Sequence, residues 1–255
     1  MARFSVSNIS KSKKKGKTMK KLWIVSVMVG IALLFGMQSA AQAIPYIEVA
    51  IIDTVNHVTQ FVQSDTGKVT FDGVVGAWQV NVVTGLTYPF GGGTQSSPVL
   101  DLNSINATSS TGGNLIVFTD AIGYTGPIAG GKTGPFHFEA GGTVGGVSAG
   151  TLDLFALYNS NNVLFESGGT PFTVIGSLGT FTAGPFSGAT DIAAFPGVTS
   201  PYALGIQAQI HHDGAGSTSF NASLESRQVP EPTTMLLLGS GLIGLVGLKR
   251  NFNRK

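Results

Sequence analysis

The chain has 255 residues and no cysteine, which excludes disulfide bonds, thiol catalysis and thiolate metal sites. Its formal charge of +2 is uneven, because eight of the 15 basic residues lie at or before Lys21 and four lie at or after Lys249. Between Ile44 and Gln228 there are three basic and twelve acidic residues, a net charge of −9. Phosphate contacts need clustered Lys and Arg, so this central part is not expected to bind nucleic acid.

The N-terminal residues 1–43 have the pattern of a secretory signal peptide. Lys20-Lys21 form the basic region, Leu22–Phe35 the apolar region, and Ala41-Gln42-Ala43 the small-residue cleavage site. We expect cleavage after Ala43. An uncleaved N-terminal anchor is the alternative interpretation of the same segment.

Residues 1–18 precede this pattern. They are rich in Lys and Ser without apolar periodicity, and Met19 stands directly before the basic pair. Translation therefore starts either at Met1, with a long basic extension, or at Met19. Both starts lead to the same mature chain.

The central part, residues 44–228, predicts an all-β fold. It lacks long stretches with apolar residues at helical spacing, whereas short segments alternate apolar and polar residues as strands do. Glycine-containing turns such as Gly112-Gly113 and Gly141-Gly142 separate these segments. The predicted strands are Tyr46–Ile52, Val58–Gln63, Leu115–Thr119, Phe136–Glu139, Thr151–Tyr158, Val163–Glu166 and Ser177–Thr182.

Two further pairs of strands are predicted to form hairpins. Val69–Phe71 leads through Asp72-Gly73 into Val74–Val82, and Tyr202–His211 leads through a turn at 213–216 into Phe220–Leu224. Many short strands of this kind indicate an antiparallel β-sandwich, jelly-roll-like in topology. One domain, or two domains divided near residues 141–150, would both fit this pattern.

A formal nucleophile motif occurs at Gly146-Val-Ser148-Ala-Gly150, and Asp191 and then His211 or His212 follow in the chain order of α/β-hydrolases. The motif requires a strand, a sharp turn and then a helix. The segment after Ser148 predicts a strand instead, and with 36 glycines in the chain a chance match is expected. We therefore predict no catalytic residue here.

Metal ligands are also sparse. His137-x-Glu139 offers a ligand and a base, and His211-His212-Asp213 offers three potential ligands. Consecutive residues of a strand point to opposite faces, so the second group cannot converge on one ion. No further ligand stands at a zinc or calcium spacing. The prediction is no metal and no cofactor.

Aromatic side chains give the remaining candidate site. Trp78, Tyr88, Tyr124 and Tyr202 could stack on sugar rings. Trp78 is in phase with Val80, which favours a position in the core. Both interpretations stay open at this stage.

The C-terminal residues 229–255 have three parts in a fixed order. Pro230-Glu231-Pro232 predict a stiff extended stalk, because proline fixes φ and lacks an N–H. The apolar residues 233–248 predict a transmembrane helix of about 24 Å, a short span for a hydrocarbon core of about 30 Å. The basic end, which would stop transfer on the cytoplasmic side, consists of Lys249, Arg250, Arg254 and Lys255.

This order resembles the PEP-CTERM sorting signal of Gram-negative bacteria, over roughly a tenth of the chain. The resemblance implies export across the inner membrane, transient anchoring there, and processing by an exosortase, a membrane-embedded cysteine transpeptidase. It also implies a final place at the cell surface or outside the cell, in bacteria that make exopolysaccharide. The expected partners are thus the exosortase, the inner membrane and exopolysaccharide. A membrane anchor that is never cleaved is the alternative.

Together these patterns predict an exported, non-enzymatic protein with a structural or adhesive role in an exopolysaccharide or biofilm matrix. Two alternatives remain. A carbohydrate-binding module would show exposed coplanar aromatic rings on one face of the sandwich. A secreted hydrolase would show clustered carboxylates, or an assembled triad around Ser148, in a cleft.

Overall fold

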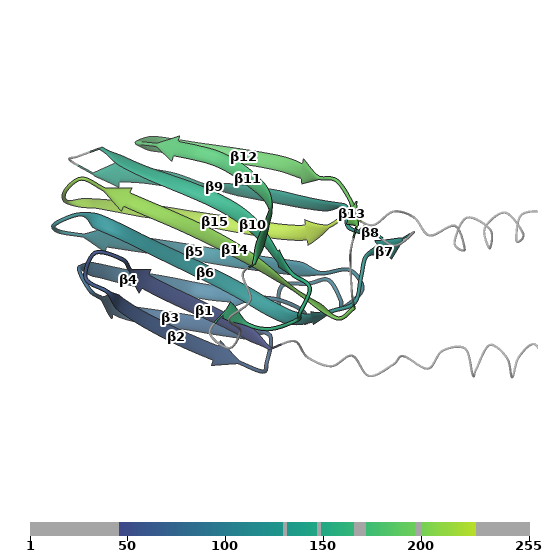
Figure 1. The fold of residues 1–255 in the computed structure, drawn as a ribbon. Coiled ribbons are helices and arrows are strands. Elements are labelled where there is room, and N and C mark those ends of the chain that lie inside the picture. The colour runs from purple at the N-terminus through teal and green to yellow at the C-terminus, as the bar shows by residue number, and fades with distance from the viewer. Residues whose placement is uncertain (1–45, 130–131, 147–148, 166–171, 197–199, 228–255) are drawn as a thin grey trace, which may run out of the picture. The chain divides into compact units, whose positions relative to one another are not determined.

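The structure is a computed structural model that describes residues 46–129, 132–146, 149–165, 172–196 and 200–227 (Figure 1). The predicted signal peptide and the predicted C-terminal helix lie outside these ranges. Within them, no helix is long and apolar enough to cross a membrane. The all-β prediction is confirmed.

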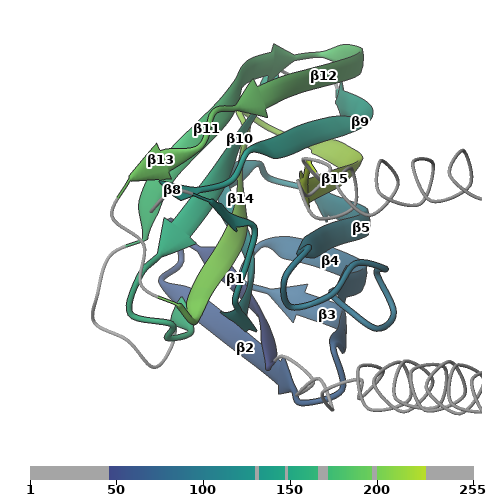
Figure 2. The same cartoon turned by 90° about the vertical axis from the view of Figure 1, so that its right-hand side faces the viewer.

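Twelve long strands form two six-stranded sheets that lie face to face as two layers (Figure 2). The first sheet has the order β11 (Thr173–Thr182), β10 (Gly150–Asn159), β14 (Tyr202–His212), β6 (Gly113–Tyr124), β1 (Ile47–Asp53) and β2 (Val58–Ser64). The second has the order β12 (Gly184–Ile192), β9 (Phe136–Gly146), β15 (Gly216–Ser226), β5 (Val99–Ser109), β4 (Trp78–Leu86) and β3 (Lys68–Val75). Three two-residue strands form a small third sheet: β13 (Phe195–Pro196), β8 (Lys132–Thr133) and β7 (Ile128–Ala129).

The core lies between the two large sheets and follows from the period of two along each strand. On β14, Leu204, Ile206, Ala208 and Ile210 are buried in the shared core, while Gln209 on the opposite side is exposed. The largest fully buried side chains include Trp78, Tyr124, Tyr202, Phe136 and Phe138. The predicted antiparallel sandwich is therefore confirmed.

The two predicted hairpins have different outcomes. The pairing of the first is confirmed, because β3 pairs with β4 from Lys68↔Leu86 to Val75↔Trp78. Its predicted turn is wrong: Asp72-Gly73 lie within β3, and the chain turns at residues 76–77. The second is wrong: β14 pairs with β10 and β6 in the first sheet, whereas β15 pairs with β5 and β9 in the second. Each strand has one apolar face, and the turn between them carries the chain from one sheet to the other so that both faces point into the core.

The predicted strand Val163–Glu166 is also wrong in its described part. Residues 162–164 have no regular structure, and this segment lies on the outer face of the first sheet instead. There the rings of Phe165 and Phe172 contact Phe118 on β6, with centroid separations of 4.8 and 5.2 Å. Contact between aromatic rings, rather than strand pairing, holds Phe165 against the sheet.

Asp120 lies beneath the same segment and is fully buried. Its Oδ2 accepts a hydrogen bond of 3.0 Å from the backbone N–H of Phe165, while Oδ1 has no partner among the described residues. Burial, and then the neighbouring carboxylate of Glu48, raises the pKa of Asp120 well above its ordinary value. Burial in an apolar site thus favours the neutral form of this carboxyl group.

The first strand begins, and the last strand ends, at the same pole of the sandwich. At the start of β1, the Tyr46 carbonyl accepts a hydrogen bond from Ile122 N. Three residues further on, Thr125 N donates to the carbonyl of Gln95. Ser97, two residues beyond Gln95, shares a hydrogen bond of 2.9 Å with Ser226 at the end of β15. Short contacts therefore link the two ends of the folded part.

The opposite pole contains a buried histidine. His212 is 1% exposed, its ring lies 5.6 Å from the ring of Trp78, and its Nε2 shares a hydrogen bond of 2.9 Å with Thr218. Its Nδ1 has no partner among the described residues. Burial, and then the neighbouring His211, lowers the pKa of His212.

An added methyl group is expected to have a large effect on stability at one of two adjacent glycines of β9 and a small effect at the other. A Cβ on Gly142 would lie 2.7 Å from Phe220 Cα, whereas a Cβ on Gly141 would meet nothing nearer than Phe186 O at 3.6 Å. We expect Gly142→Ala to lower the free energy of unfolding by about 1–3 kcal/mol, because the backbone must shift. Gly141→Ala is the matched control, with a change below about 1 kcal/mol. Equal urea midpoints for the two variants would contradict the packing described.

His212 predicts a loss of stability in mild acid. The unfolded chain takes up this proton near the ordinary pKa of 6.5, while the folded state resists it. The contribution of neutral His212 to the free energy of unfolding is therefore complete above pH 6.5. It is lost as the pH falls from there through the lower pKa of the folded state. Urea unfolding at several pH values should show a wild-type stability that falls relative to His212→Gln. His211→Gln should keep most of this pH dependence, because it removes the smaller cause of the shift and leaves the burial of His212 unchanged. A His212→Gln variant with the full wild-type pH dependence would refute the assignment.

Candidate functional site

The outer face of the second sheet carries two adjoining hollows. Their volumes are about 630 and 470 Å³, and Gly141 and Asn221 line both. Their lining residues come from five neighbouring strands, β12, β9, β15, β5 and β4. We call this joint depression the trough; four strand spacings give it a length of about 19 Å.

Strand alternation decides which side chains reach the trough. On β15, Phe220, Ala222 and Leu224 are buried in the core, so Asn221 and its neighbours two residues away point outward. In the register of the sheet, Gly141 on β9 stands between Asn221 on β15 and Ser187 on β12. Because glycine has no side chain, the centre of this row is low.

The side chains of the trough are small and polar. Among the residues that the structure describes, no Lys or Arg lines either hollow, and Glu139 is the one acidic residue that does. The amides and hydroxyls that line it include Asn81, Asn103, Asn106, Ser187, Ser219 and Asn221. An amide group both donates and accepts hydrogen bonds, as does a hydroxyl. The surface therefore suits a neutral ligand rich in hydroxyl groups.

A β-bulge fixes the amide at the centre of the trough. Ser104 on β5 has a φ of 57°, outside the strand region. Its backbone N–H donates a hydrogen bond to Asn221 Oδ1. This contact uses one of the two acceptor positions of Asn221 Oδ1. Among the described residues, the two amide hydrogens of Asn221 have no acceptor. Local backbone geometry thus orients Asn221 before any ligand binds.

One end of the trough is acidic. Glu139 on β9 and Asp101 on β5 flank Ser223 on β15 in the same row. Burial raises the pKa of Asp101, a hydrogen bond from Ser223 opposes the shift, and the carboxylates of Glu225 and Glu139 add to it. An anionic ligand would meet repulsion at this end.

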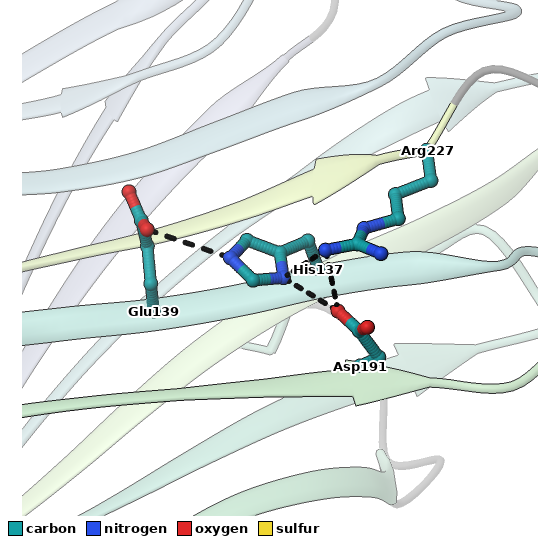
Figure 3. Close-up of polar contacts among 4 residues, drawn as sticks. All are labelled: His137, Glu139, Asp191 and Arg227. Atoms are coloured by element: carbon teal, nitrogen blue, oxygen red, sulfur yellow. Dashed lines mark hydrogen bonds and ion pairs between the residues drawn. The ribbon is translucent and has the colours of Figure 1, made fainter.

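A four-residue cluster lies beside the acidic end (Figure 3). His137 Nδ1 lies 2.7 Å from Asp191 Oδ1, and its Nε2 lies 3.4 Å from Glu139 Oε2. Arg227 Nη2 lies 2.9 Å from the same oxygen of Asp191. These contacts join β9, β12 and the residue after β15, so the cluster holds the edge of the sheet together.

The cluster contains residues of two candidate sites that the sequence suggested, a metal site and a catalytic triad. His137 and Glu139 do lie together, but both ring nitrogens of His137 already face carboxylates. Asp191, the acid of the suggested triad, contacts His137 and not His211 or His212. In the described ranges no group of three or more His, Asp or Glu residues has the geometry of a metal site.

The suggested triad does not assemble from its described members. In the sheet, Asp191 stands opposite His137 of β9. Thr218, the hydrogen-bond partner of His212, stands opposite Val144, which is seven residues further along β9. Seven residues of strand span about 23 Å. Asp191 therefore does not take the place that the formal motif would give it, and Ser148 lies outside the described residues.

The aromatic residues that the sequence offered for sugar stacking are buried. Trp78, Tyr124 and Tyr202 are 0% exposed, and Tyr88 is 3% exposed. Tyr124 and Tyr202 use their hydroxyls inside the protein, on Thr87 and on the carbonyl of Gly126. The stacking interpretation is wrong for these residues, and the core interpretation of Trp78 is confirmed.

The sequence prediction missed the trough altogether. Asn103 and Asn106 lie on β5 and Ser187 on β12, two strands that were not predicted. The available signal was weak: Asn, Ser or Gly at alternate positions opposite buried residues. Only the pairing of strands distant in sequence shows that these positions form one surface.

The predicted sorting residues Pro230, Glu231 and Pro232 lie outside the described part of the chain, as do Ala41, Ala43 and the basic C-terminal end. They enter the comparison with known proteins instead. No curated protein matches the chain.

Several solved structures show distant similarity. TmCBM61 in complex with β-1,4-galactotriose is 8% identical, with a TM-score of 0.30 over 61% of this chain and 92% of that chain. The CBM22-1–GH10 modules of Clostridium thermocellum xylanase 10B with xylohexaose are 12% identical, with a TM-score of 0.30 over 64% of this chain and only 28% of that chain. A structure from a study of promiscuous carbohydrate-binding modules of the β-sandwich superfamily is 9% identical, with a TM-score of 0.30 over 71% and 73%. Similarity at this level assigns neither ligand nor activity.

The C-terminal region gives a more specific result. Residues 228–251 match the family model of the PEP-CTERM protein-sorting motif. The match covers the residues on which the resemblance was based and does not extend to the sandwich. The chain carries a PEP-CTERM protein-sorting motif at its C-terminal end.

Proposed function

We propose that this protein is exported, processed by an exosortase, and then acts by association at the cell surface or in the exopolysaccharide matrix. The observation that carries the proposal is the PEP-CTERM motif at residues 228–251. It follows directly on a cysteine-free antiparallel sandwich with an acidic charge balance. Such a domain needs neither disulfide formation nor a metal in order to fold after export.

The processing step has a physical basis in the tail. Pro230 and Pro232 prevent the helix that follows from extending toward the sandwich, so the residues between them stay open to an enzyme. The helix predicted at 233–248 is short, and the basic residues after Leu248 are expected to snorkel to the headgroups and complete the anchor. Anchoring by this helix is transient in the proposal, and the signal peptide is removed after Ala43.

Association is favoured over hydrolysis because the trough is a shallow open face and the suggested triad is not assembled. The one feature that favours a hydrolase is the pair Asp101 and Glu139, whose backbones are two strand spacings, about 10 Å, apart. Asp191 binds Arg227 and His137 instead of facing the trough. A binding function requires only the shape and polarity of the face.

Processing can be tested by intact-mass measurement of the protein from its native host. We expect an N-terminus at Ile44 and no residues 249–255. Replacing both Pro230 and Pro232 by alanine should let the helix extend and leave the basic end attached. Thr233→Ala, next to the stalk, is the control and should be processed normally. Wild-type protein that stably keeps both ends would overturn the processing step.

The associative role can be tested by retention in the matrix. Fractionation of host cultures should find the wild-type protein in the matrix, and deletion of residues 44–228 should reduce cell aggregation at least several-fold. Ser148→Ala, His137→Ala and His211→Ala should each leave aggregation intact, because an associative role needs no catalytic side chain. The loss of aggregation through one of these changes, in a folded protein, would point to an enzyme.

A further inference from the structure

We infer that the trough is a binding site for an uncharged, linear glycan that lies across strands β12 to β4. This inference rests on the proposed function, because it names the polymer class with which the exported domain would associate.

The floor of the trough excludes a peptide strand as its ligand. Peptides that add to a sheet pair with the free backbone groups of an edge strand. Here β9, β15 and β5 are interior strands, each paired on both sides. Their backbone N–H and C=O groups are used within the sheet, so recognition must depend on side chains.

The charge of the lining excludes polyanions. Phosphate and carboxylate polymers are bound by Lys and Arg, and neither lines the hollows. Glu139, with Asp101 beside it, would repel them. Lipid is disfavoured as well, because Asn, Ser, Thr and Gly supply most of the lining and no exposed large apolar side chain does.

A neutral glycan can be recognised by side chains alone and carries no charge that the acidic residues would repel. Each hydroxyl of a sugar donates and accepts a hydrogen bond, and Asn81, Asn103 and Asn106 offer both functions from neighbouring strands. Asn221 is oriented by the bulge at Ser104, which lowers the entropy lost on binding. The continuous length of about 19 Å, set by the strand spacing, accommodates several sugar units.

Two glycines on the outer side of β9 give a matched pair of variants. Gly141 lies on the floor shared by both hollows, and its Cβ position is 3.6 Å from the nearest atom. Gly145, four residues along the same side, lines neither hollow, and its Cβ position is 3.4 Å from Ser217 O. Leucine at either position is sterically compatible with the strand, but only Gly141→Leu fills the trough.

The test is affinity electrophoresis of protein purified from the host, in detergent if it remains membrane-bound. The gels contain hydroxyethylcellulose, galactan or dextran as neutral probes and alginate as the acidic probe. We expect at least one neutral glycan, and not alginate, to retard the wild-type protein. Gly141→Leu should weaken this retardation at least tenfold, whereas Gly145→Leu should preserve it. Circular dichroism confirms that both variants are folded.

Asn103→Ala provides a second variant, which removes an amide group from the trough and adds no bulk to it. It should weaken retardation several-fold, while Gln79→Ala, on the outer face of β4 but outside the hollows, should not. Absence of retardation by every neutral probe, equal retardation by alginate, or unchanged binding by Gly141→Leu would each overturn the inference.

The outcomes separate this inference from the proposed function. Matrix retention without glycan binding would overturn the trough as the site and leave the associative role standing. Glycan binding by a protein that is not retained in the matrix would overturn the associative role and leave the site standing.

Discussion

Burial of one apolar face of each large sheet against the other is the interaction on which the rest of the structure depends. The chain has no disulfide to hold its two layers together, and the shared core of Trp78, Phe136, Phe138, Leu204 and their neighbours supplies that cohesion. Because alternate residues of each strand satisfy the core, the residues between them are free to be small and polar. The trough on the second sheet consists of such residues.

The outer faces of the two sheets are used in different ways. On the first sheet, the segment with Phe165 and Phe172 packs on Phe118 and buries Asp120 beneath it. On the second sheet, no described segment covers the row of Ser187, Gly141 and Asn221, which stays open. The same period-two pattern thus gives a second small core on one side and a polar surface on the other.

Local sequence predicted much of this fold and little of its site. The alternation in Tyr202–His211 and the pairing of the two strands that became β3 and β4 depend on neighbours in sequence, and both were predictable. The turn between β3 and β4 was placed too early, at Asp72-Gly73, because Asp-Gly is a common turn pair but lies within β3 here. The strands β5 and β12 were missed, because Asn, Ser and Gly interrupt their apolar residues. The assignment of β14 and β15 to different sheets depends on pairing with distant strands, which no local pattern encodes. For the same reason the trough, assembled from residues 81 to 223, could not be foreseen.

The common pole of Tyr46 and Ser226 has a consequence for orientation. A domain tethered through either of these ends points the same way, because both tethers leave from one side of it. Passing from an N-terminal to a C-terminal attachment would therefore not turn the domain over. The pole with Trp78 and His212 lies at the far end of the sandwich from both attachment points (Figure 1), so a domain held in this way would leave the trough on its flank open to polymer.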